Sequence, residues 1–458
     1  MPRSIAEKIS GTAVGRATLL LALTLVASTS CTRSSPRPKI VVLGEDFSNT
    51  SALERFREED EKALGVDLEF VKNTFDVFNQ KANADLASGT GLYDVILHYS
   101  SVLTTYGRNR WVLTVEEQKS LFPEGDYSFE GDIFPEVWRD SSFVRLRDGA
   151  EPVALGYPFC GNTMVLVYNR QLFEDPNARA DFLKAHKRNL QPPATWQEFR
   201  EVAEFFTDRQ RKSYGVVLQG ASGSPLYWEW VNFAFGLGDG VMAKRYGWDG
   251  TPTTPLLLTS PRTVKATEFY LSLRPFNAGD FFSTGQAEQQ EIMKSKDVAM
   301  AIMWSDSLFA LVDGGSGSRF GFAPVPGGKS LIGGGTFFIN RKSAHARDAV
   351  RYVARAMQRR AQVAYMSQGL TSALSTAYSE PAVTKLPYSR AVLESLERAQ
   401  YMLESGPDAG LILSEVEKAV QGSWRGEATA AVALAGAQEA IEAQRVGLFS
   451  LSGATAVK

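Results

Sequence analysis

The chain has 458 residues, of which 44% are hydrophobic, so it is long enough for two or three domains with ordinary apolar cores. The 49 basic and 51 acidic side chains leave a formal net charge of −2 at pH 7. This balance lacks the strong positive charge that nucleic acid or an anionic membrane surface attracts. We therefore expect a globular protein without a nucleic-acid partner, and the low charge is compatible with a neutral ligand.

The N-terminal segment is typical of an export signal. Basic residues precede an apolar run at 17–27, which is shorter than the about 20 residues that span a bilayer and has the layout of a secretory signal. Small residues then lead to Cys31, as in a bacterial lipoprotein lipobox in which Cys31 is acylated. Ser28 stands where that motif usually has an apolar residue, so ordinary cleavage a residue or two before Cys31 is the alternative. We expect a signal peptide at 1–31 and a polar tether at 32–38.

Cysteine and histidine are too few and too scattered for a metal site. The second cysteine, Cys160, lies in an apolar segment and is expected to be a small buried hydrophobe with no disulfide partner. The histidines, His98, His186 and His345, are far apart, and neither a C-x-x-C nor an H-x-x-x-H spacing occurs. We therefore expect no metal and no cofactor.

The mature chain begins with alternating strands and helices. Apolar or alternating segments at 39–43, 66–70 and 93–97 predict strands, and amphipathic stretches between them predict helices. This alternation indicates βαβ units and a mostly parallel sheet.

The middle of the chain continues the same pattern. A strand is predicted at 164–168 and another at 214–218. Between them, Thr195 and Glu198 form a T-x-x-E capping box, in which each side chain satisfies a free backbone donor at a helix start. The apolar run at 297–304 predicts a further buried strand, and the C-terminal third is helical.

Six short pieces, in this order, resemble the bacterial extracellular solute-binding proteins (family 1) of sugar-importing ABC transporters. The pieces are Asp94-Val95, Tyr168-Asn169, Pro193-Ala194-Thr195-Trp196-Gln197-Glu198-Phe199, Ala299-Met300, Pro324-Val325-Pro326-Gly327-Gly328 and Gly334-Gly335. The resemblance covers about residues 39–446 and implies an α/β, two-lobed periplasmic-binding-protein fold (type II). Each lobe would be a mostly parallel sheet flanked by helices, with a discontinuous hinge. Lobe one would comprise 39–156 plus 299–332, and lobe two 157–298 plus 333–458.

The resemblance also implies a function. Such a protein captures a carbohydrate, here a di- or oligosaccharide, between its lobes and delivers it to ABC transporter permease subunits. It would be a monomer without enzymatic activity, at work in the periplasm or on the outer face of the cytoplasmic membrane, where Cys31 would provide a lipid anchor. The main alternative is a protein of the same fold for a non-sugar solute such as a polyamine, a glycerophosphodiester or a metal chelate.

Two further alternatives depart from transport. A secreted glycoside hydrolase would need an acid and a nucleophile at a fixed separation. Glu45 and Glu229 are available carboxylates, but no motif pairs them, and no G-x-S-x-G signature occurs. A sensor that passes its closed form to a membrane receptor is the other alternative.

Candidate ligand-binding residues follow from the rule that ligands of doubly wound sheets lie beyond the carboxyl ends of strands. Aromatic faces would cover the apolar face of a sugar, and carboxylates would bind its hydroxyls. The candidates after the predicted strands or at the lobe crossings are Glu45, Asp46, Tyr99, Tyr157, Trp304 and Asp306. For each of them the alternative is a solvated loop, a helix cap or a packed core residue.

The segment 227–230 and the glycine run at 333–335 complete the candidates. Tyr227, Trp228, Glu229 and Trp230 place three rings beside one carboxylate. On a helix Trp228 and Trp230 point to different faces, so at most one of the two is expected to face the solute. Gly334 would let the backbone approach a ligand closely, and a plain hinge-crossing turn is the alternative.

Overall fold

The computed structural model describes residues 37–147, 150–243, 254–313, 319–400, 406 and 408–454, with side chains described up to residue 448. From Pro38 onward the chain forms one compact unit. The predicted signal peptide and Cys31 lie outside the described residues.

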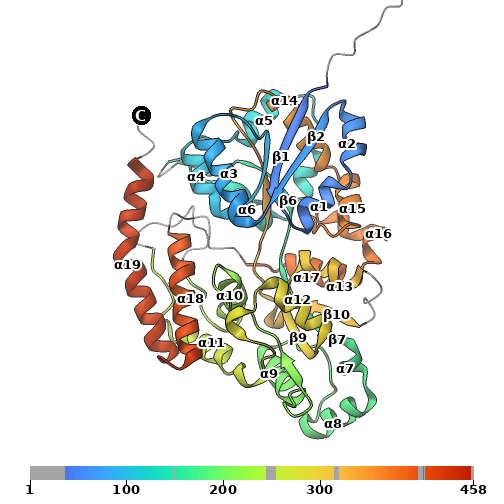
Figure 1. Cartoon of the computed structure of the whole chain (residues 1–458), viewed down its shortest axis with the longest axis vertical. Helices are drawn as coiled ribbons and strands as arrows, with labels where there is room; N and C mark the ends of the chain where they lie inside the picture. Colours follow the sequence, from blue (N-terminus) through green and yellow to red (C-terminus); the bar gives the residue numbers. More distant parts are fainter. Residues whose placement is uncertain are drawn as a thin grey trace, which may run out of the picture. The chain divides into compact units, whose positions relative to one another are not determined.

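Two main sheets organise the fold (Figure 1). The first has the strand order β2 (Asp67–Asn73), β1 (Lys39–Glu45), β3 (Val95–Tyr99), β11 (Gly335–Ile339) and β6 (Gly156–Cys160). The second has the order β10 (Phe320–Pro324), β7 (Met164–Asn169), β9 (Asp297–Trp304) and β8 (Ser213–Val216). A short pair, β4 (Phe143–Val144) and β5 (Val153–Ala154), stands apart. We call each main sheet with its helices the first or the second lobe.

Helices surround both sheets. The chain up to β6 contains α1 (Ser48–Glu54), α2 (Arg57–Leu64), α3 (Phe75–Ser88), α4 (Leu103–Arg108), α5 (Val115–Leu121) and α6 (Pro135–Ser142). The middle contains α7 (Arg170–Glu174), α8 (Pro176–His186), α9 (Trp196–Phe205), α10 (Pro225–Leu237), α11 (Pro261–Leu271), α12 (Gln286–Ser295) and α13 (Leu308–Val312). The C-terminal part contains α14 (Ala346–Ala356), α15 (Arg359–Met366), α16 (Pro381–Thr384), α17 (Ser389–Leu396), α18 (Ala409–Arg425) and α19 (Ala430–Ala454). Helices α18 and α19 pack side by side and contact α11 (Figure 1).

The main sheets are mixed, whereas the sequence pattern predicts mostly parallel ones. The βαβ strands pair in parallel, β1 with β2 and β3, and β8 with β9. In contrast, β11 is antiparallel to β3 and β6, and β7 is antiparallel to β9 and β10. Strands β7 and β11 each follow a segment that crosses between the sheets, so they enter their sheets against the direction of the βαβ strands.

The lobe boundaries differ from the predicted ones. The chain crosses between β6 and β7 and returns between β10 and β11, and these crossings pair through Thr163 and Ile332. The predicted lobe-one segment 299–332 therefore carries β10 and most of β9, which lie in the second sheet. Strand β11, predicted for lobe two, lies in the first sheet, and α14 packs against it. An apolar strand has the same sequence pattern in either sheet because its partners are distant in sequence.

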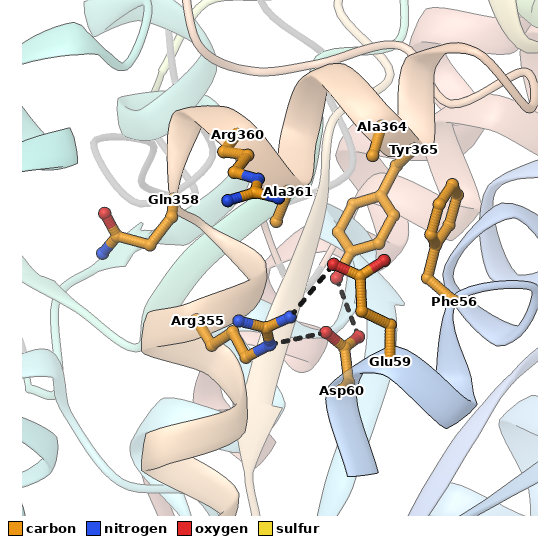
Figure 2. Close-up of a pocket in the computed structure, with 9 residues that line it drawn as sticks. All are labelled: Phe56, Glu59, Asp60, Arg355, Gln358, Arg360, Ala361, Ala364 and Tyr365. Atoms are coloured by element: carbon orange, nitrogen blue, oxygen red, sulfur yellow. Dashed lines mark hydrogen bonds and ion pairs between the residues drawn. The ribbon is translucent and has the colours of Figure 1, made fainter. Parts of the chain in front are cut away.

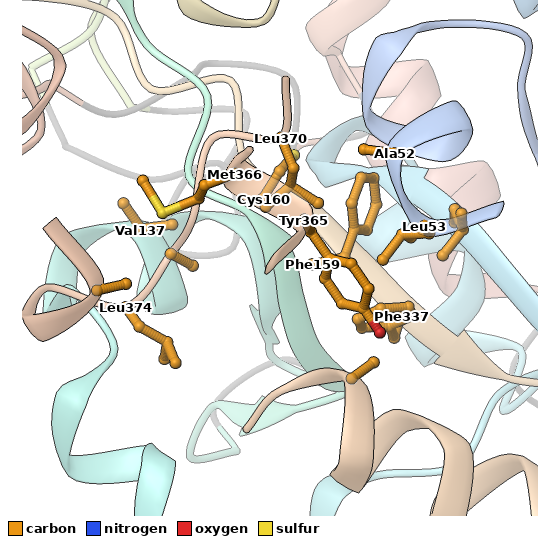
Figure 3. Packing of buried hydrophobic residues seen from close by; sticks show 14 of the residues in the cluster. Ala52, Leu53, Val137, Phe159, Cys160, Phe337, Tyr365, Met366, Leu370 and Leu374 are labelled. Atoms are coloured by element: carbon orange, nitrogen blue, oxygen red, sulfur yellow. The ribbon is translucent and has the colours of Figure 1, made fainter. Parts of the chain in front are cut away.

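The capping box and the buried cysteine agree with prediction. Thr195 accepts from the Glu198 backbone N–H, and the Glu198 carboxylate accepts from the Thr195 N–H in return, at the start of α9. Cys160 is fully buried and free among the residues that the structure describes. It lies on β6 among Phe159, Phe337 and residues of α1 and α15 (Figure 3). Burial raises the pKa of its thiol to about 12, so it acts as a small hydrophobe rather than a nucleophile.

Candidate functional site

Two predicted residues meet at the carboxyl ends of neighbouring parallel strands. Glu45 ends β1 and Tyr99 ends β3. The Tyr99 hydroxyl donates a hydrogen bond of 2.6 Å to Glu45 Oε2. Burial raises the pKa of Glu45 above its ordinary value, and the adjacent Asp46 adds to the rise. The parallel sheet thus places an aromatic ring and a carboxylate together, as the strand-end rule predicts.

Asp306 lies just beyond the end of β9, in the second lobe, yet its contacts come from three parts of the chain. Its carboxylate accepts from Asn162 Nδ2 at 2.8 Å, from Asn49 Nδ2 at 3.3 Å and from Gln286 Nε2 at 3.4 Å. The Ser48 hydroxyl donates to the Asp306 carbonyl at 2.9 Å. Asp306 therefore joins α1 of the first lobe, the β6–β7 crossing and α12 of the second lobe.

Asp306 and the Glu45–Tyr99 pair influence one another electrostatically. Burial raises the pKa of Asp306 to about 7, and the Glu45 carboxylate is the next cause. Burial also raises the pKa of Tyr99 well above its ordinary value, with further contributions from Glu45 and Asp306. We call Glu45, Tyr99, Asp306 and the amides that bind Asp306 the strand-end cluster. It combines carboxyl, hydroxyl and amide groups from both lobes.

The amide residues of the strand-end cluster are not among the sequence-predicted candidates. Asn49 is only 1% exposed, and its Oδ1 has no hydrogen-bond partner among the described residues. Since its amide nitrogen donates to Asp306, the oxygen is left as a buried acceptor without a donor in the described part of the chain. In sequence, Asn49 has the pattern of a helix cap, and Asn162 lies in a crossing that no local pattern reveals. Gln286 opens an ordinary amphipathic helix.

Trp304 and Trp228, both candidates from the sequence, pack against each other. Their rings pack edge to face with centroids 5.7 Å apart. Trp304 is only 3% exposed, and a Cβ placed on Gly333 would lie 2.4 Å from its ring, so glycine is needed for this close packing. Trp228 is half-buried. Trp304 therefore supports the crossing segment, and Trp228 is the more accessible of the two rings.

Tyr227 and Trp230, both candidates from the sequence, lie in the core of the second lobe. The burial of Trp230 beside the half-buried Trp228 agrees with the expectation that at most one of these two rings faces the solute. Trp230 is fully buried and donates from Nε1 to Thr267 Oγ1 at 3.0 Å. Tyr227 is 1% exposed and packs against Trp230. Helix α10 is covered by α9, α11 and α18, so most of its circumference is buried.

Glu229 is likewise enclosed in the second lobe. Its carboxylate accepts from the Gln219 backbone N–H at 3.1 Å, from the Tyr270 hydroxyl at 3.1 Å and from Gln289 Nε2 at 3.0 Å. Burial raises its pKa to about 8. Glu229 is fully buried, and these partners all belong to the second lobe.

The remaining predicted residues have structural partners. Tyr157 is 1% exposed and donates to Glu130 Oε1 at 2.6 Å, so it belongs to the packed side of β6. Gly334 lies close to the Ser141 side chain and the Cys160 carbonyl, where a Cβ would be 3.2 Å and 3.3 Å from them, which fits a hinge-crossing turn. Asp46 is largely exposed and forms an ion pair of 3.5 Å with Lys72.

A cavity of about 400 Å³ lies elsewhere, between α2, α14 and α15 (Figure 2). The Asp60 carboxylate accepts from Arg355 Nε at 2.7 Å and from the Tyr365 hydroxyl at 3.0 Å. The cavity is lined only by residues of the first lobe. It therefore lacks the contribution from both lobes that ligand binding between the lobes requires.

Among the residues that the structure describes, no group of three or more His, Cys, Asp or Glu side chains could hold a metal ion. Within the same part of the chain, no helix is long and apolar enough to cross a membrane.

The family model of the bacterial extracellular solute-binding proteins matches residues 47–360. The chain belongs to this family. Its members are solute-binding components of ABC transporters, which agrees with the predicted binding function and with the predicted export of the chain. A comparison with curated proteins finds no match.

Solved structures of solute-binding proteins share the fold. One from Agrobacterium radiobacter K84, in complex with ribitol, has a TM-score of 0.72 and 20% identity over 91% of this chain and 100% of that one. One from Thermotoga lettingae, bound with α-D-tagatose, has a TM-score of 0.72 and 19% identity over 89% and 99%. Maltose-bound MalE3 of T. maritima has a TM-score of 0.70 and 16% identity over 88% and 99%. The predicted two-lobed periplasmic-binding-protein fold is confirmed.

Proposed function

We propose that this solute-binding protein captures a carbohydrate at the strand-end cluster and delivers it to the permease of an ABC importer. The observation that carries the proposal is the meeting of carboxyl, hydroxyl and amide groups from both lobes around Asp306 and Glu45. Such groups match the hydroxyls of a sugar, and the half-buried Trp228 beside Trp304 provides an apolar face. The structural neighbours named above, which were solved with ribitol, tagatose or maltose bound, support a neutral polyhydroxylated ligand.

The mechanism follows from the position of Asp306. Its hydrogen bonds reach α1 of the first lobe, the crossing and α12 of the second lobe. A ligand that adds contacts to both lobes favours the form in which the lobes are held together, and only such a difference in affinity can shift the population. The ligand-bound form would then be recognised by the two halves of the permease.

A non-sugar solute is the second candidate. The Glu45 carboxylate helps to raise the pKa of Asp306, and two carboxyl groups that interact in this way would also attract a polyamine. Among the described residues, no lysine or arginine forms a hydrogen bond or ion pair with either carboxylate. An anionic solute such as a glycerophosphodiester is therefore less well matched than a sugar or a cation.

Thermal unfolding of the purified protein with a panel of solutes tests the proposal. A ligand that binds only the folded state at about 100 times its Kd adds roughly 2.7 kcal/mol of stability. We expect a rise in the unfolding midpoint with a series of mono-, di- or oligosaccharides. A rise in the midpoint with polyamines or glycerophosphodiesters alone would overturn the carbohydrate assignment. The fold and the two-lobe binding mechanism would still stand.

The anchor and the oligomeric state belong to the same proposal. Cys31 would carry lipid at the new N-terminus and hold a monomeric receptor at the membrane, beside its permease. Mass spectrometry of the mature protein tests this, because acylation adds the mass of the lipid and begins the chain at Cys31. A mature chain that begins at another residue, without added mass, would contradict it.

A further inference from the structure

We propose that Phe75 is an outer binding platform that makes the protein prefer ligands longer than one sugar residue. This inference rests on the proposed carbohydrate function. Phe75 is the first residue of α3 and follows β2, the edge strand next to β1. It thus lies at the same sheet edge as Glu45 and Tyr99, because the carboxyl ends of parallel strands meet there.

Phe75 is the outermost of three rings in a row. Tyr99 lies between Phe159 and Phe75, with ring centroids 6.4 Å and 6.2 Å away. Exposure rises along this row: Phe159 is 1% exposed, Tyr99 is half-buried and Phe75 is 37% exposed. Phe159 begins the row beside the crossing, at Cys160. The row therefore runs outward from the crossing, past the carboxylate that Tyr99 binds, to an accessible aromatic ring.

The exposure of Phe75 is not explained by helix packing. Phe78, one turn later on the same face, is fully buried and packs against the His98 ring at 4.5 Å. Phe75 makes only edge or tilted contacts at 6.0–6.2 Å to Phe78, His98 and Tyr99. Its neighbour Val77 is also exposed, by 42%. Single exposed apolar residues are common, and Val77 lies on a different face of α3 from Phe75, so Phe75 alone is the accessible ring at the end of the aromatic row.

The polar groups nearby favour an extended ligand. Asp46, next to Glu45, is paired with Lys72 of β2, which also contacts Glu54 at 2.8 Å. These charged groups are occupied by one another, so the apolar face of a sugar has Phe75 as its available neighbour. One sugar residue would occupy the polar groups at Glu45, Asn49 and Asp306. The next residue along an oligosaccharide would then lie over Phe75.

Titration calorimetry of the Phe75→Ala protein with a monosaccharide and with its di- and oligosaccharides tests the inference. We expect the Kd of the monosaccharide to change less than about two-fold, and the Kd of the longer ligands to rise about three- to ten-fold, the size of an aromatic contact. Phe75→Trp keeps a flat ring and should retain the affinity for longer ligands, whereas Phe75→Leu keeps the apolar volume and should lose it.

Leu121→Ala is the matched control, because Leu121 has the same 37% exposure at the end of α5. It should change neither Kd. Three outcomes would overturn the role of Phe75: equal Kd changes for short and long ligands, no change for either, or a wild-type protein that binds only monosaccharides. A wild-type protein that binds no sugar would overturn the proposed function and this inference together, so the two failures are distinguishable.

Discussion

Asp306 and Glu229 are both fully enclosed carboxyl groups, but their surroundings differ. The partners of Glu229 are Gln219, Tyr270 and Gln289, all from the second lobe. Those of Asp306 come from the first lobe, the crossing and the second lobe. Burial raises the pKa of each, to about 8 for Glu229 and about 7 for Asp306. A buried carboxyl with a raised pKa is therefore not in itself a functional signal, and the origin of its partners separates the two cases.

Trp304→Ala is expected to have the largest effect near Asp306. Removing a ring that is 3% exposed and packs on Trp228 and Gly333 should lower the free energy of unfolding by about 4 kcal/mol. Because Trp304 leads directly into the turn that carries Asp306, solute affinity should fall as well. Urea unfolding and titration calorimetry measure the two effects. Unchanged affinity in a folded variant would assign this ring to the core alone and weaken the contrast with Glu229.

Glu229→Ala should lower the free energy of unfolding by about 3 kcal/mol, because the Tyr270 hydroxyl and the Gln289 amide lose their buried acceptor. Solute affinity of the folded fraction should not change, since none of these groups lies in the strand-end cluster. Denaturant titration measures the loss, with the exposed Glu58→Ala as a control within about 0.5 kcal/mol of wild type. A loss of solute binding in folded Glu229→Ala would remove the distinction between the two carboxyls.

Asp306→Asn should show the reverse pattern. The side chain keeps its size but loses one acceptor, so we expect a stability loss of about 1 kcal/mol. Because its partners connect both lobes, the same change should weaken solute binding by about five-fold. Comparison of Kd values for Asp306→Asn and Glu229→Gln tests the contrast directly. Equal effects of the two substitutions on Kd would contradict it.

The smallest expected effect is a pH dependence of stability. Glu229 has an ordinary pKa of 4.5 and a folded-state pKa of about 8, so the folded protein binds the proton more tightly than the unfolded chain. This contribution is fully present below about pH 4.5 and is lost as the pH rises through about 8. The unfolding midpoint should therefore fall between pH 5 and pH 9, about the range of this titration. In Glu229→Gln the unfolding midpoint should fall less steeply in the upper part of this pH range. Identical slopes of midpoint against pH for the two proteins would contradict the assignment.

Local patterns predicted the elements well. The capping box of Thr195 and Glu198 starts α9 as expected, because both partners lie within one helical turn. The apolar run at 297–304 is strand β9. Glu45, Tyr99 and Asp306 were predicted as candidates because they follow strands, and the structure brings them together. A hydrophobic pattern that repeats every two or every 3.6 residues involves only neighbouring residues, so it can be recognised without knowledge of the fold.

The candidates that lie in the core were proposed for the same reason. Tyr157 and Trp230 have the chemistry of sugar-binding residues, but Glu130 and Thr267 satisfy their polar atoms inside the lobes. Aromatic residues serve cores and binding sites equally well, and only the packing around them distinguishes the two. Asn162 went unnoticed for the opposite reason, since an amide in a crossing segment has no local signature.

By itself, the sequence determined the family, the alternation of strands and helices, the absence of a strong charge and the buried state of Cys160, because each depends on composition or on neighbouring residues. Only the tertiary structure decided to which sheet β9, β10 and β11 belong. It also decided that Asp306 binds amides from both lobes, whereas Glu229 is enclosed in one. These features depend on contacts between residues up to hundreds of positions apart, such as Asn49 and Asp306, and chain folding alone brings such residues together.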